Sequence, residues 1–209
     1  MGGAAGLIVI KLGGSQAFSA HLSDWLDAVA LGAGRVVIVP GGGPFADAVR
    51  SAQPAMGFDD RAAHRMALLA MEQYGCALAG RRPQFTLADS AATIRRAMRA
   101  GGVPVWAPSR MTLRAKDVPW SWDVTSDSLA AWLAGALGAK LLLLVKPIDT
   151  PPGPVRAADL AARGIVDPAF PRFLGASGAQ AYIAGPSEHA AVAAAIRAGA
   201  IAGARIDLD

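Results

Sequence analysis

Short apolar runs alternate with longer segments of helical periodicity along the whole chain. Continuous apolar runs at 7–11, 35–39, 103–107 and 140–145 predict buried strands, because a strand covered on both faces needs no polar side. Further strands are expected at 85–88, 181–184 and 204–208, and helices at 19–31, 44–52, 59–79, 90–100, 125–137, 157–163, 167–174 and 187–198. This alternation predicts an α/β protein with a mainly parallel sheet covered by helices on both faces.

The length and composition indicate one domain over residues 1–209, of which 53% are hydrophobic. The longest aliphatic run, 141–145, is far shorter than the roughly 18–20 residues of a membrane span. The first ten residues have no basic side chain before their apolar part, which argues against a secretory signal. A single cysteine excludes a disulfide framework. We therefore expect a cytoplasmic protein with no membrane partner.

The net charge of +4 comes from 16 arginines and 4 lysines against 16 acids. Proteins that bind nucleic acid usually gather their basic residues in blocks or stripes. Here the arginines are scattered, and the densest pairs are 81–82 and 95–96. We interpret them as a solvated surface and expect no nucleic-acid partner, while a positive pocket for small anions stays compatible with the composition.

Two glycine loops each follow a predicted strand and precede a helix. The first contains Gly13, Gly14 and Ser15, and the second contains Gly41, Gly42 and Gly43. Glycines let the backbone approach a ligand closely, and the helix behind each loop offers free N–H groups to an anion. One such loop is as compatible with a plain tight turn as with a phosphate site, and neither is a P-loop. Together they favour anion binding.

Two of the four lysines, Lys11 and Lys146, lie at the ends of predicted strands. A strand-end lysine can be a solvated edge residue, but a lysine is also a point charge that can follow a phosphoryl group during transfer. Asp127 lies at the start of a predicted helix, where its charge could simply interact favourably with the helix dipole or could hold both ammonium groups in place. We interpret the three residues as candidate catalytic groups.

The remaining candidates are weaker. His64 lies in the first turns of the helix at 59–79 with Arg61 beside it, and a guanidinium matches phosphate in a bidentate way. The three histidines have no metal-ligand spacing, so no metal site is predicted. Cys76 is expected to be buried and inert, and Trp120 and Trp122 to cover the edge of the core.

In combination and in this order, five segments resemble the amino acid kinase superfamily: 8–15 (IVIKLGGS), 36–47 (VVIVPGGGPFAD), 123–134 (DVTSDSLAAWLA), 142–149 (LLLVKPID) and 203–208 (GARIDL). The resemblance implies a three-layer α/β/α sandwich. Within the superfamily, the segments at 59–75 and 122–130 are most similar to the small phosphate kinases of methanofuran and methylofuran biosynthesis.

The resemblance implies an ATP-dependent kinase with Mg²⁺, a phosphorylated small-molecule acceptor and a homo-oligomeric state. The acceptor would be an aminomethylfuran-methyl monophosphate, bound by the N-terminal part, with the nucleotide bound by the part from about residue 123. The implied site residues are Lys11, Asp127 and Lys146 for catalysis, Gly13, Gly14 and Ser15 for the ATP phosphates, and Gly41, Gly42, Gly43, Arg61, His64 and Thr125 for the acceptor.

Several alternatives remain open at this point. The acceptor could be isopentenyl phosphate, a nucleoside monophosphate or an amino acid carboxylate. The same fold also serves in oxyanion storage, so a protein that binds without turnover is the second reading. An acceptor amine would need an acidic partner, for which Asp47, Asp59, Asp60 and Asp123 are equal candidates.

Overall fold

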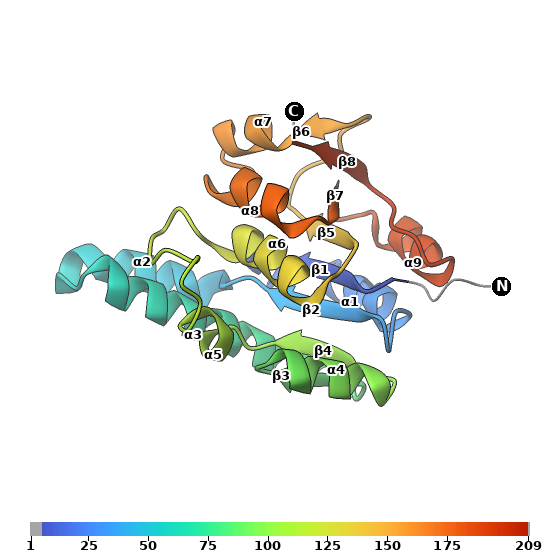
Figure 1. Cartoon of the computed structure of the whole chain (residues 1–209), viewed down its shortest axis with the longest axis horizontal. Helices are drawn as coiled ribbons and strands as arrows, with labels where there is room; N and C mark the ends of the chain where they lie inside the picture. Colours follow the sequence, from blue (N-terminus) through green and yellow to red (C-terminus); the bar gives the residue numbers. More distant parts are fainter. Residues whose placement is uncertain (1–5, 209) are drawn as a thin grey trace.

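A computed structural model describes residues 6–208 and contains one eight-stranded sheet flanked by helices (Figure 1). The first five residues, on which the argument against a signal sequence partly rests, lie outside the described part of the chain. The strands are β1 (Ile8–Leu12), β2 (Val36–Pro40), β3 (Phe85–Ala88), β4 (Val103–Trp106), β5 (Leu141–Val145), β6 (Val155–Arg156), β7 (Gln180–Ala184) and β8 (Ala204–Asp207). The predicted α/β class is confirmed.

The strand order is β3-β4-β2-β1-β5-β7-β8-β6, and every neighbouring pair is parallel except β7 with β8. The chain builds outward from β1 to one side through β2, and later returns to the other side of β1 with β5. The carboxyl ends of β1, β2 and β5 therefore lie together at the point where the strand order reverses. This is where open parallel sheets bind their ligands.

Alternate residues of each central strand face opposite layers. In β1, Ile8, Ile10 and Leu12 belong to the apolar cluster under helices α1 (Leu22–Ala30) and α9 (His189–Arg197). Val9 belongs to the opposite cluster, and Lys11 shares its face. Lys11 thus points toward the layer that contains α6 (Ser126–Leu137).

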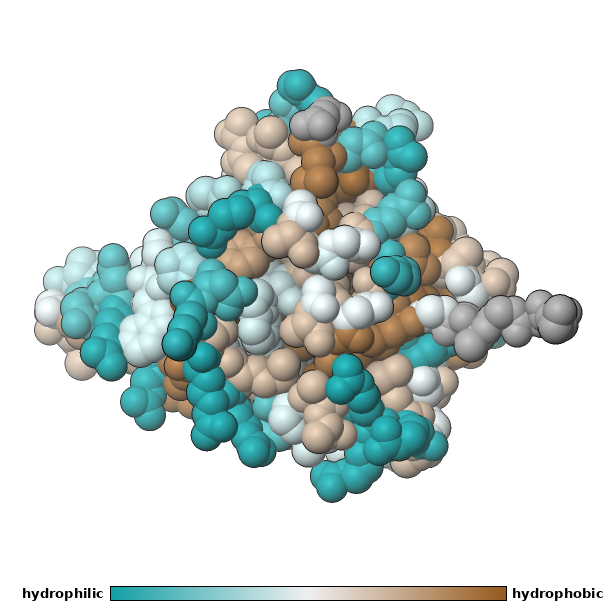
Figure 2. Space-filling view, in the orientation of Figure 1, coloured by the Kyte–Doolittle hydropathy of each residue, from teal (hydrophilic) through white to brown (hydrophobic). Residues whose placement is uncertain are grey.

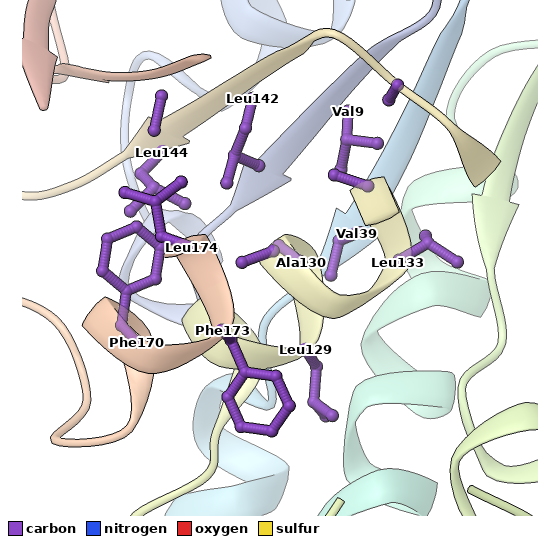
Figure 3. Close-up of a cluster of buried hydrophobic side chains, with 14 of the residues drawn as sticks. Val9, Val39, Leu129, Ala130, Leu133, Leu142, Leu144, Phe170, Phe173 and Leu174 are labelled. Atoms are coloured by element: carbon purple, nitrogen blue, oxygen red, sulfur yellow. The ribbon is translucent and has the colours of Figure 1, made fainter. Parts of the chain in front are cut away.

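The α6 layer is closed by a second helix, α8 (Phe170–Ser177), which packs along α6. Figure 3 shows the apolar side chains that join this layer to the sheet: Val9, Val39, Leu142 and Leu144 from the strands, Leu129, Ala130 and Leu133 from α6, and Phe170, Phe173 and Leu174 from α8. Because α6 is apolar on nearly its whole surface, it is held firmly, and its first turn is fixed relative to β1.

The remaining helices extend the two layers, and two of them, α2 and α3, pack along each other in the arm on the left of Figure 1. Their bounds are α2 (Gly43–Met56), α3 (Asp60–Ala79), α4 (Ala91–Arg99), α5 (Ser109–Thr112) and α7 (Ala157–Ala162), with a 3₁₀ turn η1 (Gly14–Gln16) after β1. Within residues 6–208, none of the helices combines the length and apolarity required to cross a bilayer. On the face shown in Figure 2, hydrophilic residues are spread widely, with smaller hydrophobic areas between them.

Two local expectations were wrong, and two short elements were missed. We expected a loop at 53–58, but α2 continues through Pro54 and ends at Gly57, which adopts φ +71° and donates its N–H to the carbonyl of Gln53. Cys76 is exposed, because it lies on the solvent side of α3, opposite Tyr74 and Leu78. The short elements α5 and β6 were not expected, since four and two residues carry no readable periodicity.

Candidate active site

Two lysines and one aspartate meet at the carboxyl ends of β1 and β5. The Lys11 ammonium forms an ion pair with Oδ1 of Asp127 at 2.9 Å, and Lys146 donates a hydrogen bond to Oδ2 at 2.8 Å. The side chains are 6%, 4% and 12% exposed for Lys11, Asp127 and Lys146. One buried carboxylate therefore holds two ammonium groups side by side.

The surroundings set the protonation of this cluster. Burial lowers the pKa of Lys11, and the nearby Lys146 lowers it further, while Asp127 opposes the shift. Burial alone would raise the pKa of Asp127, but the two ammonium groups outweigh it and hold that pKa below its usual value. Asp127 is therefore ionised at neutral pH and offsets the charge of the two lysines.

The two glycine loops pack directly against each other. A Cβ on Gly41 would lie 2.3 Å from the Gly14 nitrogen, and a Cβ on Gly14 would lie 2.1 Å from the nitrogen of Gly43. Gly43 also has φ +54°, in the left-handed region. Glycine is thus required here by close backbone approach, and the packed loops form the floor next to Lys11.

The first turn of α6 is capped from another part of the chain. The N-cap residue Thr125 makes no side-chain cap of its own. Instead, Oδ2 of Asp167 accepts hydrogen bonds from the amides of Thr125 and Ser128, each 3.0 Å long, and from the Thr125 hydroxyl at 2.8 Å, while the Ser128 hydroxyl donates to Oδ1. Burial and the nearby Asp127 raise the pKa of Asp167, against these donors.

Sequence reasoning missed Asp167. We expected it to begin the helix at 167–174, whereas α8 begins at Phe170 and the aspartate serves α6. An aspartate before an apolar segment looks like a local helix cap. Nothing in the linear pattern signals that its partners lie about forty residues earlier in the chain.

A cavity of about 550 Å³ opens above this cluster. Its wall includes nine of the predicted site residues: Lys11, Gly13, Gly14, Ser15, Gly42, Gly43, His64, Thr125 and Lys146. Three others lie elsewhere: Asp127 is buried behind the lysines, Gly41 faces Gly14, and Arg61 places its guanidinium 4.6 Å from the ring centre of Trp120. The guanidinium on the cavity wall belongs to Arg50, which the sequence did not single out.

His64 is the buried histidine of the site. It is 5% exposed, its ring lies parallel to that of Trp120 at 6.4 Å, and its Nε2 has no hydrogen-bond partner. Burial lowers the pKa of His64, opposed by a hydrogen bond with the Ser121 backbone, so the imidazole is neutral at pH 7. An unpartnered buried nitrogen calls for an explanation, and a hydrogen bond to a ligand in the cavity that His64 lines would supply one.

Trp122 holds one side of the cavity in place. Trp122 lines the cavity rather than only covering the core edge, and its Nε1 donates to Oε1 of Gln53 at 2.7 Å. The Arg50 guanidinium lies 4.6 Å from the Trp122 ring centre. These contacts fix the 121–124 loop against α2 and close one side of the cavity.

The structure also separates the four acids that could face an amine. Asp47 lines the cavity. Asp59 caps α3 by accepting from the Ala62 amide, Asp60 accepts from Gln53, and the exposed Asp123 is not on the cavity wall. Among the described acids, Asp47 is therefore the one placed to meet a bound cation.

A parallel sheet with paired lysines and glycine loops at its switch point is typical of enzymes that transfer phosphoryl groups. The chain belongs to the amino acid kinase family, whose model matches residues 6–150. A relative in Methanocaldococcus jannaschii, (5-(aminomethyl)furan-3-yl)methyl phosphate kinase, is 25% identical over 186 residues, which cover 84% of this chain and 86% of the relative.

Solved structures confirm the three-layer fold. Uridylate kinase from Archaeoglobus fulgidus matches with a TM-score of 0.71 at 16% identity, over 96% of this chain and all of that one. UMP kinase from Bacillus anthracis matches with a TM-score of 0.69 at 16% identity, over 97% of this chain and 96% of that one. Family membership, the relative and the fold together support an ATP-dependent kinase as the class of enzyme.

Proposed function

We propose that the protein transfers the γ-phosphoryl group of ATP to the phosphate of (5-(aminomethyl)furan-3-yl)methyl phosphate. A bond forms between an acceptor phosphate oxygen and the γ-phosphorus, and the bond from that phosphorus to the β–γ bridging oxygen breaks. The products are ADP and a diphosphate. An acceptor phosphate is already ionised near neutral pH, so no strong general base is needed.

The observation that carries the proposal is the pair of lysines bound to one buried aspartate beside the glycine loops. Phosphoryl transfer depends mainly on positioning and on neutralising the charge of the phosphates. Lys11, on the cavity wall next to Gly13, is assigned to the transferring group, and Lys146 to the leaving side of ATP. Asp127 keeps both ammonium groups charged and fixed.

The nucleotide is assigned to the C-terminal side of the cavity. Lys146, Ile148 and Ile165 line that end, and Gly13, Gly14 and Ser15 offer backbone N–H groups to its phosphates. Mg²⁺ would be held mainly by the phosphates themselves, since the described residues of the cavity wall supply a single carboxylate, that of Asp47.

The acceptor is assigned to the side formed by α2, α3 and the 121–124 loop. His64 presents a neutral imidazole there, and Asp47 supplies a negative charge near Arg50. A compound with a phosphate at one end and an ammonium at the other matches a wall that carries both signs of charge. The named activity of the Methanocaldococcus jannaschii relative supports this choice of acceptor.

The test is ADP release with Mg²⁺ and ATP against four acceptors: the furan phosphate, isopentenyl phosphate, uridine monophosphate and acetylglutamate. The proposal expects turnover with the furan phosphate to exceed the others by at least tenfold in kcat/KM. Faster turnover with another acceptor would keep the kinase and discard the furan. ATP binding without turnover on any of them would favour a storage or binding protein.

A further inference from the structure

Two of the three histidines of the chain meet on the opposite layer, away from the kinase cavity. His21 is the N-cap residue of α1, and His189 is the first residue of α9. Their ring centres are 5.5 Å apart, with planes inclined by 31°. Figure 1 shows α1 and α9 side by side, so residues near opposite ends of the chain come together here.

A carboxylate completes the group. Asp24 lies three residues after His21, on the same side of the first turn of α1. Its Oδ2 is 3.7 Å from Nε2 of His189, and one ligand atom from each of the three residues lies within 4.8 Å of the others. A search for metal-ligand spacing along the sequence cannot find this group, because the three residues come from two helices at opposite ends of the chain.

The position of His189 is fixed by its neighbours. The fully buried Trp25 meets the His189 ring edge to face at 6.4 Å, and its Nε1 donates to the carbonyl of Pro186 at 2.7 Å. This bond ties the turn before α9 to α1. The backbones that carry the three side chains are thus held in place before any ligand arrives, which lowers the cost of binding.

We propose that His21, Asp24 and His189 form a binding site for a divalent transition metal, with Zn²⁺ as the best match. Two imidazoles and one carboxylate are a ligand set that zinc accepts, with the fourth position left to water. Zinc bond lengths of about 2.0–2.2 Å require these atoms to approach further, which rotation of half-exposed side chains permits. None of the three lines the kinase cavity, so this site is separate from the Mg²⁺ that accompanies ATP.

A bound metal ion would cross-link α1 to α9. Because α1 and α9 cover the same face of the sheet, this cross-link would stabilise the folded chain without changing the phosphate cavity. At a metal concentration a hundredfold above Kd, the expected rise in Tm is roughly 5–11 °C.

The test is calorimetric titration of tag-free protein with ZnCl₂ in the absence of nucleotide, in a Cys76→Ser background that removes the exposed thiol. We expect one Zn²⁺ per chain. His21→Gln and His189→Gln should each weaken binding by more than tenfold, since even outer-shell losses cost about 10- to 100-fold. His64→Gln, which alters the third histidine, should bind Zn²⁺ like the parent.

Thermal unfolding with and without Zn²⁺ gives the second readout and confirms that each variant is folded. The parent and His64→Gln should gain stability with Zn²⁺, and the His21→Gln/His189→Gln double variant should not. A parent that binds Zn²⁺ no more tightly than the double variant would overturn the proposal.

Discussion

Asp167, which lies in the loop before α8, accepts hydrogen bonds from both the amide and the hydroxyl of Ser128, a residue of α6 that lies 39 positions earlier in the chain. The same carboxylate accepts hydrogen bonds from the amide and the hydroxyl of Thr125. It therefore sets the direction of the first turn of α6, and with it the position of Asp127 between the two lysines. We therefore expect Asp167 to be a positioning residue that acts through Asp127.

Replacing Asp167 with Asn should lower both stability and rate. An amide keeps one acceptor oxygen but replaces the other with an NH2 group, so it cannot accept all four hydrogen bonds from Thr125 and Ser128, and the free energy of unfolding should fall by about 1–3 kcal/mol. The loosened Asp127 should reduce kcat more than it changes the KM for ATP. Urea unfolding and steady-state kinetics measure the two effects, with Asp159→Asn on the exposed side of α7 as the control. A normal kcat in folded Asp167→Asn would contradict the positioning role.

Substitution of either lysine of the site should lower the rate, whereas substitution of a lysine elsewhere should not. Lys11→Met and Lys146→Met should each lower kcat by roughly 10²–10³-fold, the usual cost of removing one preorganised charge contact to the transition state. Lys116→Met, at an exposed position, should keep the parental rate. If Lys11→Met or Lys146→Met loses only affinity for ATP and turns over normally, the protein uses these lysines for binding alone.

Local signals in the sequence were enough for most of the fold. The apolar runs of β1, β2 and β5 are local signals, as are the glycine loops that follow β1 and β2, so their pattern predicts both the strands and the site at their ends. Lys11, Lys146 and Asp127 could be singled out because each lies at the boundary of a predicted element, and the structure brings them together.

What the sequence could not show depends on contacts between distant segments. Asp167 caps α6 from beyond the next strands, and Arg50 lies on the cavity wall beside Trp122, which comes from a loop about seventy residues later in the chain. His21 and His189 meet because α1 and α9 cover the same face. None of these has a spacing that can be read along the chain, because the sheet order decides which helices become neighbours.

Removing the charge of Asp127 should destabilise the fold. Asp127→Asn leaves two buried ammonium groups side by side with no counter-charge, and breaking a buried ion pair in this way typically costs about 3–5 kcal/mol. Urea unfolding without nucleotide measures the loss. Asp123→Asn is the matched control, since Asp123 is an exposed acid in the preceding loop. A loss below about 1 kcal/mol would show that the lysines find other partners.

The pH dependence should report the lowered pKa of Lys11. Because this pKa lies below the ordinary 10.5 in the folded protein, the ammonium loses its proton early as pH rises, and kcat/KM for ATP should fall through a pKa below 10.5. The folded state then binds fewer protons than the unfolded state, so the free energy of unfolding should rise with pH between these two values. Lys11→Arg should lose both effects, because a guanidinium stays charged. The same alkaline limb in Lys11→Arg would assign it to another group.

Asp47 should determine whether an acceptor amine is recognised. Asp47→Asn removes the negative charge from the cavity wall, so the KM for the furan phosphate should rise by roughly two- to fivefold, about the value of one exposed ion pair, while the KM for ATP stays constant. Asp123→Asn should leave both constants unchanged. An acceptor whose amine is acetylated provides the second arm, because it should be used equally by parent and Asp47→Asn. If the parent enzyme uses the acetylated compound and the free amine with equal kcat/KM, the ammonium group is not recognised. That result would favour an acceptor phosphate that carries no positive charge.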